Sequence, residues 1–298
     1  MTFIDLHTHG LAGHDARSKD PDEYLKLAEA MAAHGTGAFL PTLFPAPIDE
    51  MRAVMKAVRT AMERQESGFS DKSFGDAVQG PAKILGVHLE GPFINPAKAG
   101  ALDPSAFAKP SLKNFTKLTE GFEDVIKIIT VAPELPGAAW VIEKSAGMGI
   151  RVNMGHSDAS FMQTSEGRKA GATGVTHLFN AMSGLHHRQP GLVGYALADD
   201  GLYVELIADL AHVHPAALML VLKCKPKDRV ILVSDSLREA KTEGMPPKGP
   251  LYLPDEKTLA GSGITLSDAV GNMVSLGLGE DEAAAMASEN PRRYLEGA

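Results

Sequence analysis

The sequence contains a single cysteine, Cys224, among its 298 residues, so a disulfide within the chain is excluded. A lone thiol is typical of a reducing compartment, and we expect a cytoplasmic location. No apolar run is long enough to span a membrane, and the first residues lack the pattern of a signal peptide. Positive charge is not in excess either, because the formal net charge is −8. We therefore expect neither a membrane protein nor a nucleic-acid-binding protein, whereas local Arg and Lys side chains could still bind a small anion.

Apolar, β-branched runs alternate with helix-like segments along the chain. The runs lie at 3–6, 37–40, 84–89, 125–131, 150–154, 173–176, 203–208 and 229–233. Most segments between them place apolar residues at i, i+3 and i+4; they lie at 21–34, 47–66, 116–123, 138–148, 160–170 and 215–222. Eight alternating strand and helix units predict an α/β fold, a parallel (β/α)8 TIM barrel that spans residues 1–298 as a single domain.

A doubly wound open sheet is the alternative fold, but no glycine-rich dinucleotide fingerprint follows the first strand. Two segments have the composition of loops, 69–81 and 243–256. The second holds four of the nineteen prolines and is a candidate lid over a site. Residues 281–288 predict a last helix, and Asn290-Pro291 predicts its end.

Most of the predicted strands end in a residue that can bind a metal or move a proton. In chain order these residues are His7 and His9, Glu90, Glu134, His156, His177, Asp209 with His212 shortly after, and Asp235. The carboxyl ends of barrel strands meet at one face, so these side chains are expected to converge there. Two histidines at i and i+2 on a strand point to the same side, and imidazole with carboxylate suits zinc or ferrous iron. The sequence therefore predicts a divalent metal site.

A single buried histidine is more often a structural hydrogen-bonding group than a ligand. His14, His34 and His214 have no partners of this kind in the pattern, and we interpret them as structural or surface residues. His88 precedes Glu90 by two residues and shares its face of the strand, so it is a candidate for a supporting position behind the metal ligands.

Ten motifs in order along the chain resemble the amidohydrolase superfamily and, within it, the family of N-acetylglucosamine-6-phosphate deacetylases. They are HTHG at 7–10, PTLFP at 41–45, GVHLEGPFINPAKAGA at 86–101, APE at 132–134, GHSDAS at 155–160, THLFNAM at 176–182, RQPGLVG at 188–194, IADLAHVHP at 207–215, SDS at 234–236 and LAGSGITLSDAV at 259–270. HLEGPF and THLFNAM are the specific signals, since the HxH pair is shared across the superfamily.

The resemblance implies a role for each matched position. Glu90, His156 and His177 match the ligands of the principal metal, and His7 and His9 make a second metal possible, with Glu90 as a bridge. Asp235 matches the catalytic aspartate. The positions that match substrate-binding residues are Ala101, Asn180, Ala181, Arg188 and His212. In the family, Arg188 and His212 often reach a neighbouring subunit's site, so a homodimer is expected.

The chain departs from the family pattern at two points. In the family, a histidine that polarises the substrate carbonyl usually follows the Lys-x-Gly-Ala run, and Leu102 stands there instead. Its role then falls to a second metal, to His186 or His187, or else the substrate differs. The family also flanks its barrel with a small β-sandwich built from both termini, whereas this sequence begins almost at the first strand, so a bare barrel is expected.

The residues also fit the chemistry of amide hydrolysis. A metal lowers the pKa of water and stabilises the developing oxyanion, while Asp235 accepts the water proton and passes it to the leaving amine. The first hypothesis is therefore a metal-dependent deacetylase of N-acetyl-amino-sugar phosphates, with one or two zinc or iron ions per chain. A hydrolase of another amide or cyclic amide, and a catalytically weak sugar-phosphate binder, are the alternatives.

Overall fold

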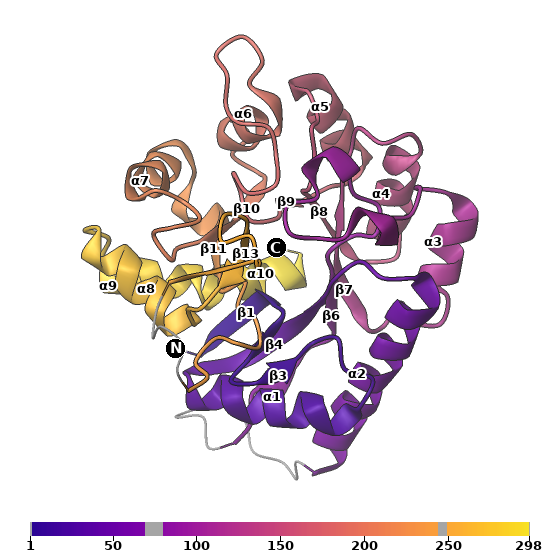
Figure 1. Ribbon diagram of the computed structural model, residues 1–298. Coiled ribbons are helices and arrows are strands. Elements are labelled where there is room, and N and C mark those ends of the chain that lie inside the picture. Colours follow the sequence, from indigo (N-terminus) through magenta and orange to yellow (C-terminus); the bar gives the residue numbers. More distant parts are fainter. Residues whose placement is uncertain (1, 69–79, 244–248, 298) are drawn as a thin grey trace.

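The computed structural model describes residues 2–68, 80–243 and 249–297. Its centre is a ring of eight parallel strands, surrounded by helices, as predicted (Figure 1). The strands are β1 (Phe3–Thr8), β4 (Thr36–Leu43), β6 (Val87–Leu89), β7 (Ile126–Val131), β8 (Arg151–Met154), β9 (Gly174–Val175), β10 (Tyr203–Ile207) and β11 (Val230–Val233). Backbone hydrogen bonds from Asp235 N to His7 O (2.9 Å) and from His9 N to Ser236 O (2.8 Å) join the end of β11 to the end of β1.

The helices follow the strands and cover the outside of the ring. They are α1 (Pro21–Ala33), α2 (Ile48–Gly68), α3 (Leu112–Thr119), α4 (Ala138–Gly147), α5 (Phe161–Ala170), α6 (Gly191–Ala198), α7 (Pro215–Cys224), α8 (Leu266–Ser275), α9 (Glu280–Met286) and α10 (Glu289–Glu296). Short 3-10 turns occupy Pro96–Lys98, Pro104–Ala106 and Lys227–Arg229. Local sequence sets several starts: Asp20 caps α1, and Ser160 forms a capping box with Gln163 at α5.

The core has two layers. The larger cluster packs the helices onto the outer faces of the strands, and a smaller one fills the inside of the barrel. The inner cluster consists of Leu6, Leu40, Ile128, Tyr203, Ile207, Ile231, Val233 and Tyr294. Tyr294 belongs to α10, which lies across the amino-terminal end of the strands, since the Asn290 side chain donates to Val230 O (2.7 Å). Helix α10 therefore closes the barrel at the amino-terminal end of its strands, and the polar side chains gather at the carboxyl-terminal end.

The third predicted strand is interrupted. The run at 84–89 divides into β5 (Lys83–Ile84) and β6, because Gly86 adopts a φ of +137° and a Cβ there would lie 2.3 Å from the Val125 carbonyl oxygen. Two short antiparallel pairs lie outside the ring: β2 (Gly10–Leu11) with β3 (His14–Asp15), and β12 (Pro250–Tyr252) with β13 (Leu259–Ser262). The predicted loop at 243–256 thus contains a strand, and its residues 244–248 lie outside the described residues, as do residues 69–79 of the other predicted loop.

Three expectations about helices were wrong. The helix predicted at 116–123 begins earlier, because Ser111 caps the start of α3. Asn290-Pro291 lies in the first turn of α10 and does not end the preceding helix, since proline is tolerated at a helix start. Helices α6 and α8 form where no helix was assigned.

None of the helices in the described ranges combines the length and the apolar character that a membrane crossing requires.

Candidate metal centre

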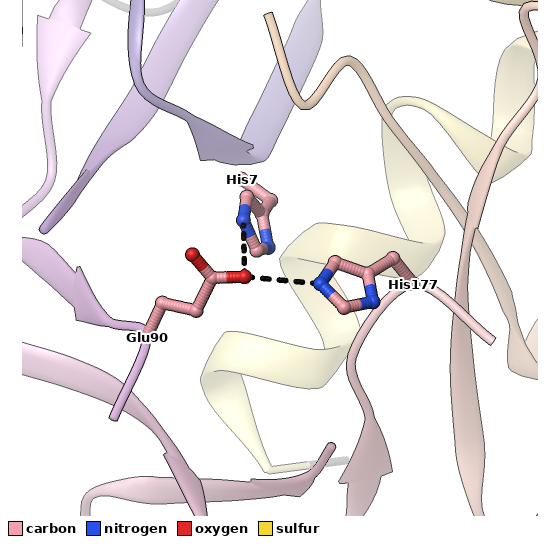
Figure 2. Close-up of side chains that lie close together, drawn as sticks. All are labelled: His7, Glu90 and His177. Atoms are coloured by element: carbon pink, nitrogen blue, oxygen red, sulfur yellow. Dashed lines mark hydrogen bonds and ion pairs between the residues drawn. The ribbon is translucent and has the colours of Figure 1, made fainter. Parts of the chain in front are cut away.

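The predicted ligands converge at the carboxyl ends of the barrel strands. His7 lies on β1 and His9 just after it, while Glu90, His156 and His177 follow β6, β8 and β9. All five are buried, none being more than 4% exposed. Figure 2 shows that His7 and His177 approach the Glu90 carboxylate from two different strands.

Glu90 is the centre of this group. Its Oε1 lies 2.9 Å from His156 Nε2, 3.0 Å from His177 Nε2 and 3.6 Å from His7 Nε2. Its Oε2 lies 3.3 Å from His9 Nε2. The Oε1 atom thus faces three imidazole nitrogens and the Oε2 atom faces one, so a single carboxylate lies between all four rings.

Asp235 lies beside the rings of His7 and His9. It follows β11, and its Oδ1 lies 3.3 Å from His9 Nε2 and 3.5 Å from His7 Nε2. His7 Nε2 and His9 Nε2 are themselves 3.2 Å apart. Two ring nitrogens and a carboxylate oxygen therefore point at one location beside Glu90.

Hydrogen bonds behind two of the histidines orient their rings. His9 Nδ1 bonds to the Thr42 carbonyl and His156 Nδ1 to the Lys98 carbonyl, each at 2.9 Å. A carbonyl only accepts, so Nδ1 carries the proton and the lone pair of Nε2 faces the cluster. Phe44 stacks on the His9 ring with centroids 3.7 Å apart and fixes its plane.

The backbone at three site residues adopts the left-handed region. The φ values are +46° for His156, +28° for His177 and +49° for Asp235. This conformation is costly for residues other than glycine and is found where the surrounding structure enforces it, often at functional sites. It turns these side chains from the strand ends toward the centre of the ring.

The charges of the cluster favour a cation. Burial would raise the pKa of Glu90, but hydrogen bonds from His156 and His177 and the charge of His7 hold it well below its usual value. Burial would lower the pKa of His9, yet the neighbouring carboxylates of Asp235 and Glu90 raise that pKa to about 10. The two carboxylates therefore attract positive charge at this place.

The donor set fits a divalent metal ion. His7, Glu90 and His177 offer atoms within 4.8 Å of one another, and so do His7, His9 and Asp235. Glu90 Oε2 is buried without a hydrogen-bond partner. Imidazole nitrogens with carboxylate oxygens suit zinc or ferrous iron and not calcium or magnesium.

The predicted substrate-binding residues are placed less uniformly. Asn180 and Ala181 follow His177 directly; the Asn180 amide donates to the His177 carbonyl (3.3 Å), and the Ala181 carbonyl accepts from Ser157 N (3.1 Å). Ala101 is half-buried in the loop after β6. His212 follows β10, and its Nδ1 lies 2.7 Å from Asp209 Oδ2.

Arg188 is exposed, and its side chain contacts the neighbouring His187, with Nη1 2.8 Å from Nε2. Among the described residues, none of the histidines of the metal centre contacts Arg188. His186 and His187 are also exposed and pack against each other. Neither is therefore held in the buried cluster as a replacement for the histidine that is absent at Leu102.

Two acidic residues near the site were missed as functional candidates or left without a role. Glu205 lies in β10, buried beneath the cluster, and burial raises its pKa to about 8. Glu134 was noted only as a strand end, yet it accepts hydrogen bonds from three groups on two loops. A charged residue inside an apolar strand was the available signal for Glu205. His88, a candidate for a supporting position, contacts the His7 ring at 4.8 Å between centroids.

Comparisons with known proteins point in one direction. A model of the amidohydrolase family matches residues 2–296. The chain is 37% identical to N-acetylgalactosamine-6-phosphate deacetylase of Escherichia coli O157:H7, covering 98% of this chain and 77% of that protein. It is 34% identical to N-acetylglucosamine-6-phosphate deacetylase of Bacillus subtilis (strain 168), covering 91% of this chain and 68% of that protein. The crystal structure of N-acetylglucosamine-6-phosphate deacetylase from Thermotoga maritima superposes with a TM-score of 0.84 at 28% identity, over 99% of this chain and 78% of the other.

Proposed function

The chain belongs to the amidohydrolase family, and we propose that it removes the acetyl group from N-acetylglucosamine 6-phosphate or a closely related N-acetyl-amino-sugar phosphate. The products are acetate and the amino-sugar phosphate. One observation carries the proposal: a buried Glu90 lies among four imidazoles beside Asp235, in a chain that resembles deacetylases of such sugars over nearly its whole length.

The residues assigned to the metal fall into two groups. Glu90, His156 and His177 hold the principal ion, and His7 and His9 hold a second one when metal is plentiful, with Glu90 shared. The ion is zinc or ferrous iron. When bound, it supplies Lewis acidity that lowers the pKa of a water molecule and polarises the amide carbonyl.

Asp235 acts as general base and then as general acid. It accepts a proton from the attacking water and passes it to the nitrogen of the leaving amine, which leaves poorly unless protonated. Its position supports both roles, because Asp235 is only 8% exposed and its Oδ1 is directed at the two histidines of β1. The hydrogen bond from Asp235 N to the His7 carbonyl (2.9 Å) holds its backbone in place.

The sugar phosphate is held by the loops at the rim. Ala101, Asn180 and Ala181 line the approach to the metal ligands, and His212 and Arg188 bind the phosphate. Asp209 accepts from the His212 ring, and this interaction fixes the histidine's orientation. Arg188 presents an exposed guanidinium on the loop that leads into α6.

A second candidate substrate is N-acetylgalactosamine 6-phosphate. It is favoured by the relative with 37% identity, which carries that name. The leucine at position 102 also favours a further alternative, a substrate with a different amide or a cyclic amide, because leucine cannot polarise a carbonyl. In the present proposal a second ion, which His7 and His9 would hold, would supply that polarisation in place of the absent histidine.

We also propose a single catalytic unit over residues 1–298 that works as a homodimer in the cytoplasm. The C-terminal apolar residues Met273 and Leu278 are buried against the barrel and leave no apolar patch for a partner to cover. Among the exposed apolar side chains, Phe161 and Met162 at the start of α5 are 41% and 74% exposed, and Leu185 near Arg188 is 50% exposed; Leu112, Met148, Leu220 and Tyr252 are exposed on other elements. Apolar exposure of this kind supports an interface at the loop that carries Arg188.

The deciding experiment is acetate release from a panel of N-acetyl-hexosamine 6-phosphates, with the metal content of the same sample quantified. We expect turnover of the gluco or galacto epimer, and Asp235→Asn as the matched control should reduce kcat by ~10²- to 10⁴-fold. Phosphorylated sugars left intact by protein loaded with zinc or iron would contradict the proposal, and release from a cyclic amide instead would favour the alternative.

A further inference from the structure

A carboxylate that the proposed reaction does not use lies inside the barrel below the metal ligands. Glu205 is 2% exposed. Its Oε1 accepts a hydrogen bond from the Asn153 side-chain amide at 2.8 Å, whereas its Oε2 is buried without a hydrogen-bond partner. That oxygen lies 3.5 Å from His7 Nδ1, which also lacks a hydrogen-bond partner. Two unpaired buried polar atoms therefore face each other, one of them on a predicted metal ligand.

These two residues do not form a separate metal site with His88. His7, His88 and Glu205 do lie close enough to be considered as a ligand group. However, His88 Nδ1 is bonded to the Leu6 carbonyl and Nε2 to Thr130 Oγ1, both at 2.9 Å. With both ring nitrogens engaged, His88 has no free donor for an ion. The contact between Glu205 and His7 must serve another purpose.

We propose that Glu205 is a positioning residue for the second metal ion: its Oε2 accepts the Nδ1 proton of His7, which leaves the Nε2 lone pair for the ion. This inference rests on the proposed function only in that His7 is a metal ligand. His7 Nε2 already points into the group formed by His9, Asp235 and Glu90, at 3.2, 3.5 and 3.6 Å. His9 and His156 use backbone carbonyls for the same purpose.

A carboxylate behind His7 has a stronger effect than a carbonyl. In its ionised form, which a bound cation would favour over the neutral acid, it fixes the ring tautomer, raises the basicity of the coordinating nitrogen and supplies a negative charge near the ion. A buried carboxylate in turn needs positive charge nearby. The second site, built from the HxH pair, thus has its own supporting carboxylate within the barrel.

The surrounding network leaves one oxygen of Glu205 for this role. The Tyr294 hydroxyl donates to Asn153 Oδ1 and accepts from Thr173 Oγ1 at 3.1 Å. Asn153 is thereby oriented with its amide nitrogen toward Glu205 Oε1. Since Oε1 is engaged from below, Oε2 is the oxygen that remains for the His7 ring.

Glu205→Gln is the informative substitution because Asn153 restricts how the new amide can lie. The oxygen of the new glutamine must accept from the Asn153 amide, so the glutamine nitrogen faces His7 Nδ1. Because that nitrogen donates, it favours the His7 tautomer that is protonated at Nε2. We expect the dissociation constant of the second zinc ion to rise by about 10- to 100-fold, and that of the first ion to change less than about twofold. Both constants come from competition with a chromophoric chelator at equilibrium, without any measurement of activity.

Three further measurements complete the test. Asp5→Asn is the matched control, because Asp5 is also buried but accepts from the His7 backbone nitrogen (3.2 Å) and not from its ring; the affinity of the second ion should change little. His7→Asn gives the reference for complete loss of the second site. In the zinc-loaded wild-type protein, nitrogen-15 NMR of labelled histidine should show His7 protonated at Nδ1.

The results separate this inference from the proposed function. Unchanged affinity for the second ion in Glu205→Gln, or equal weakening of both ions, overturns the positioning role. If that variant does not fold, the wild-type spectrum decides, and a His7 ring protonated at Nε2 overturns the inference. A protein that binds two zinc ions as described but releases no acetate from any sugar phosphate refutes the proposed function and leaves the role of Glu205 intact.

Discussion

Replacement of Glu134 should loosen the loop that holds His156. Glu134 Oε1 accepts from the Asn95 side-chain amide (2.8 Å) and from Asp158 N (2.7 Å), and Oε2 accepts from the Ser157 hydroxyl (2.7 Å). Asn95 lies in the loop after β6 and donates from its backbone to the His156 carbonyl (3.0 Å). A single carboxylate therefore fastens two loops on either side of a metal ligand.

The loss in Glu134→Ala can be worked out from these three bonds. A hydrogen bond to a charged group contributes about 1.5–3 kcal/mol. Asp158 is exposed and Asn95 is half-buried, so water replaces the carboxylate for these two donors, whereas Ser157 is buried. We expect the free energy of unfolding to fall by about 3 kcal/mol, from one full bond and two partial ones. Glu134→Gln keeps an oxygen for both N–H donors, and the Ser157 hydroxyl can accept from the new amide, so about 1 kcal/mol is expected.

Urea denaturation of the metal-free protein measures this loss. With a slope of about 3 kcal/mol per molar urea, the midpoint of Glu134→Ala should fall by about 1 M. The principal zinc ion should also bind about tenfold more weakly, because the support of His156 is disturbed. Asp103→Ala, which removes a cap in the same loop region, is the control and should cost less than about 1 kcal/mol. A wild-type midpoint for Glu134→Ala, or equal damage from Gln and Ala, would falsify the reasoning.

Three further predictions concern the metal, the phosphate and the dimer. His7→Asn should reduce the zinc content in excess metal from two ions per chain to one, since Glu90, His156 and His177 are untouched; elemental analysis that never exceeds one ion in the wild type would contradict this. Arg188→Ala should raise KM for phosphorylated sugars by about 10- to 100-fold, the loss of one charge-assisted bond, and leave unphosphorylated sugars nearly unchanged; equal effects on both would remove the phosphate from its role. Mixing Asp235→Asn chains with Arg188→Ala chains should restore part of the activity if Arg188 serves the partner's site, and light scattering should give the mass of a dimer; a monomer or no recovery would mean that each barrel works alone.

The sequence alone was sufficient for the barrel and for the convergence of the proposed metal ligands at one end of it. Each strand is a local apolar run, and each proposed ligand directly follows or ends one, as Glu90 follows β6 and His156 follows β8. Parallel strands bring such ends to one face whatever the details of the helices. The meeting of these residues therefore depended on a repeated local pattern and not on any single long-range contact.

The helices were predicted less well because their signals are ambiguous or absent. Pro291 fits the start of a helix as well as its end, and the chain uses it in the first turn of α10. Helix α6 is apolar on most of its surface and half of it is buried, so it lacks the periodic pattern that marks an amphipathic helix.

Only the tertiary structure decided how the site is supported. Nothing in the sequence pairs Glu205 with the ring of His7, Thr42 with His9, or Lys98 with His156, because these contacts join strands and loops that are distant in the chain. The left-handed backbone of His177 and Asp235 likewise depends on the closed ring, whose packing enforces a conformation that neither residue prefers. Residue identity determined which groups can bind an ion, and the closure of the barrel determined which of their atoms face it.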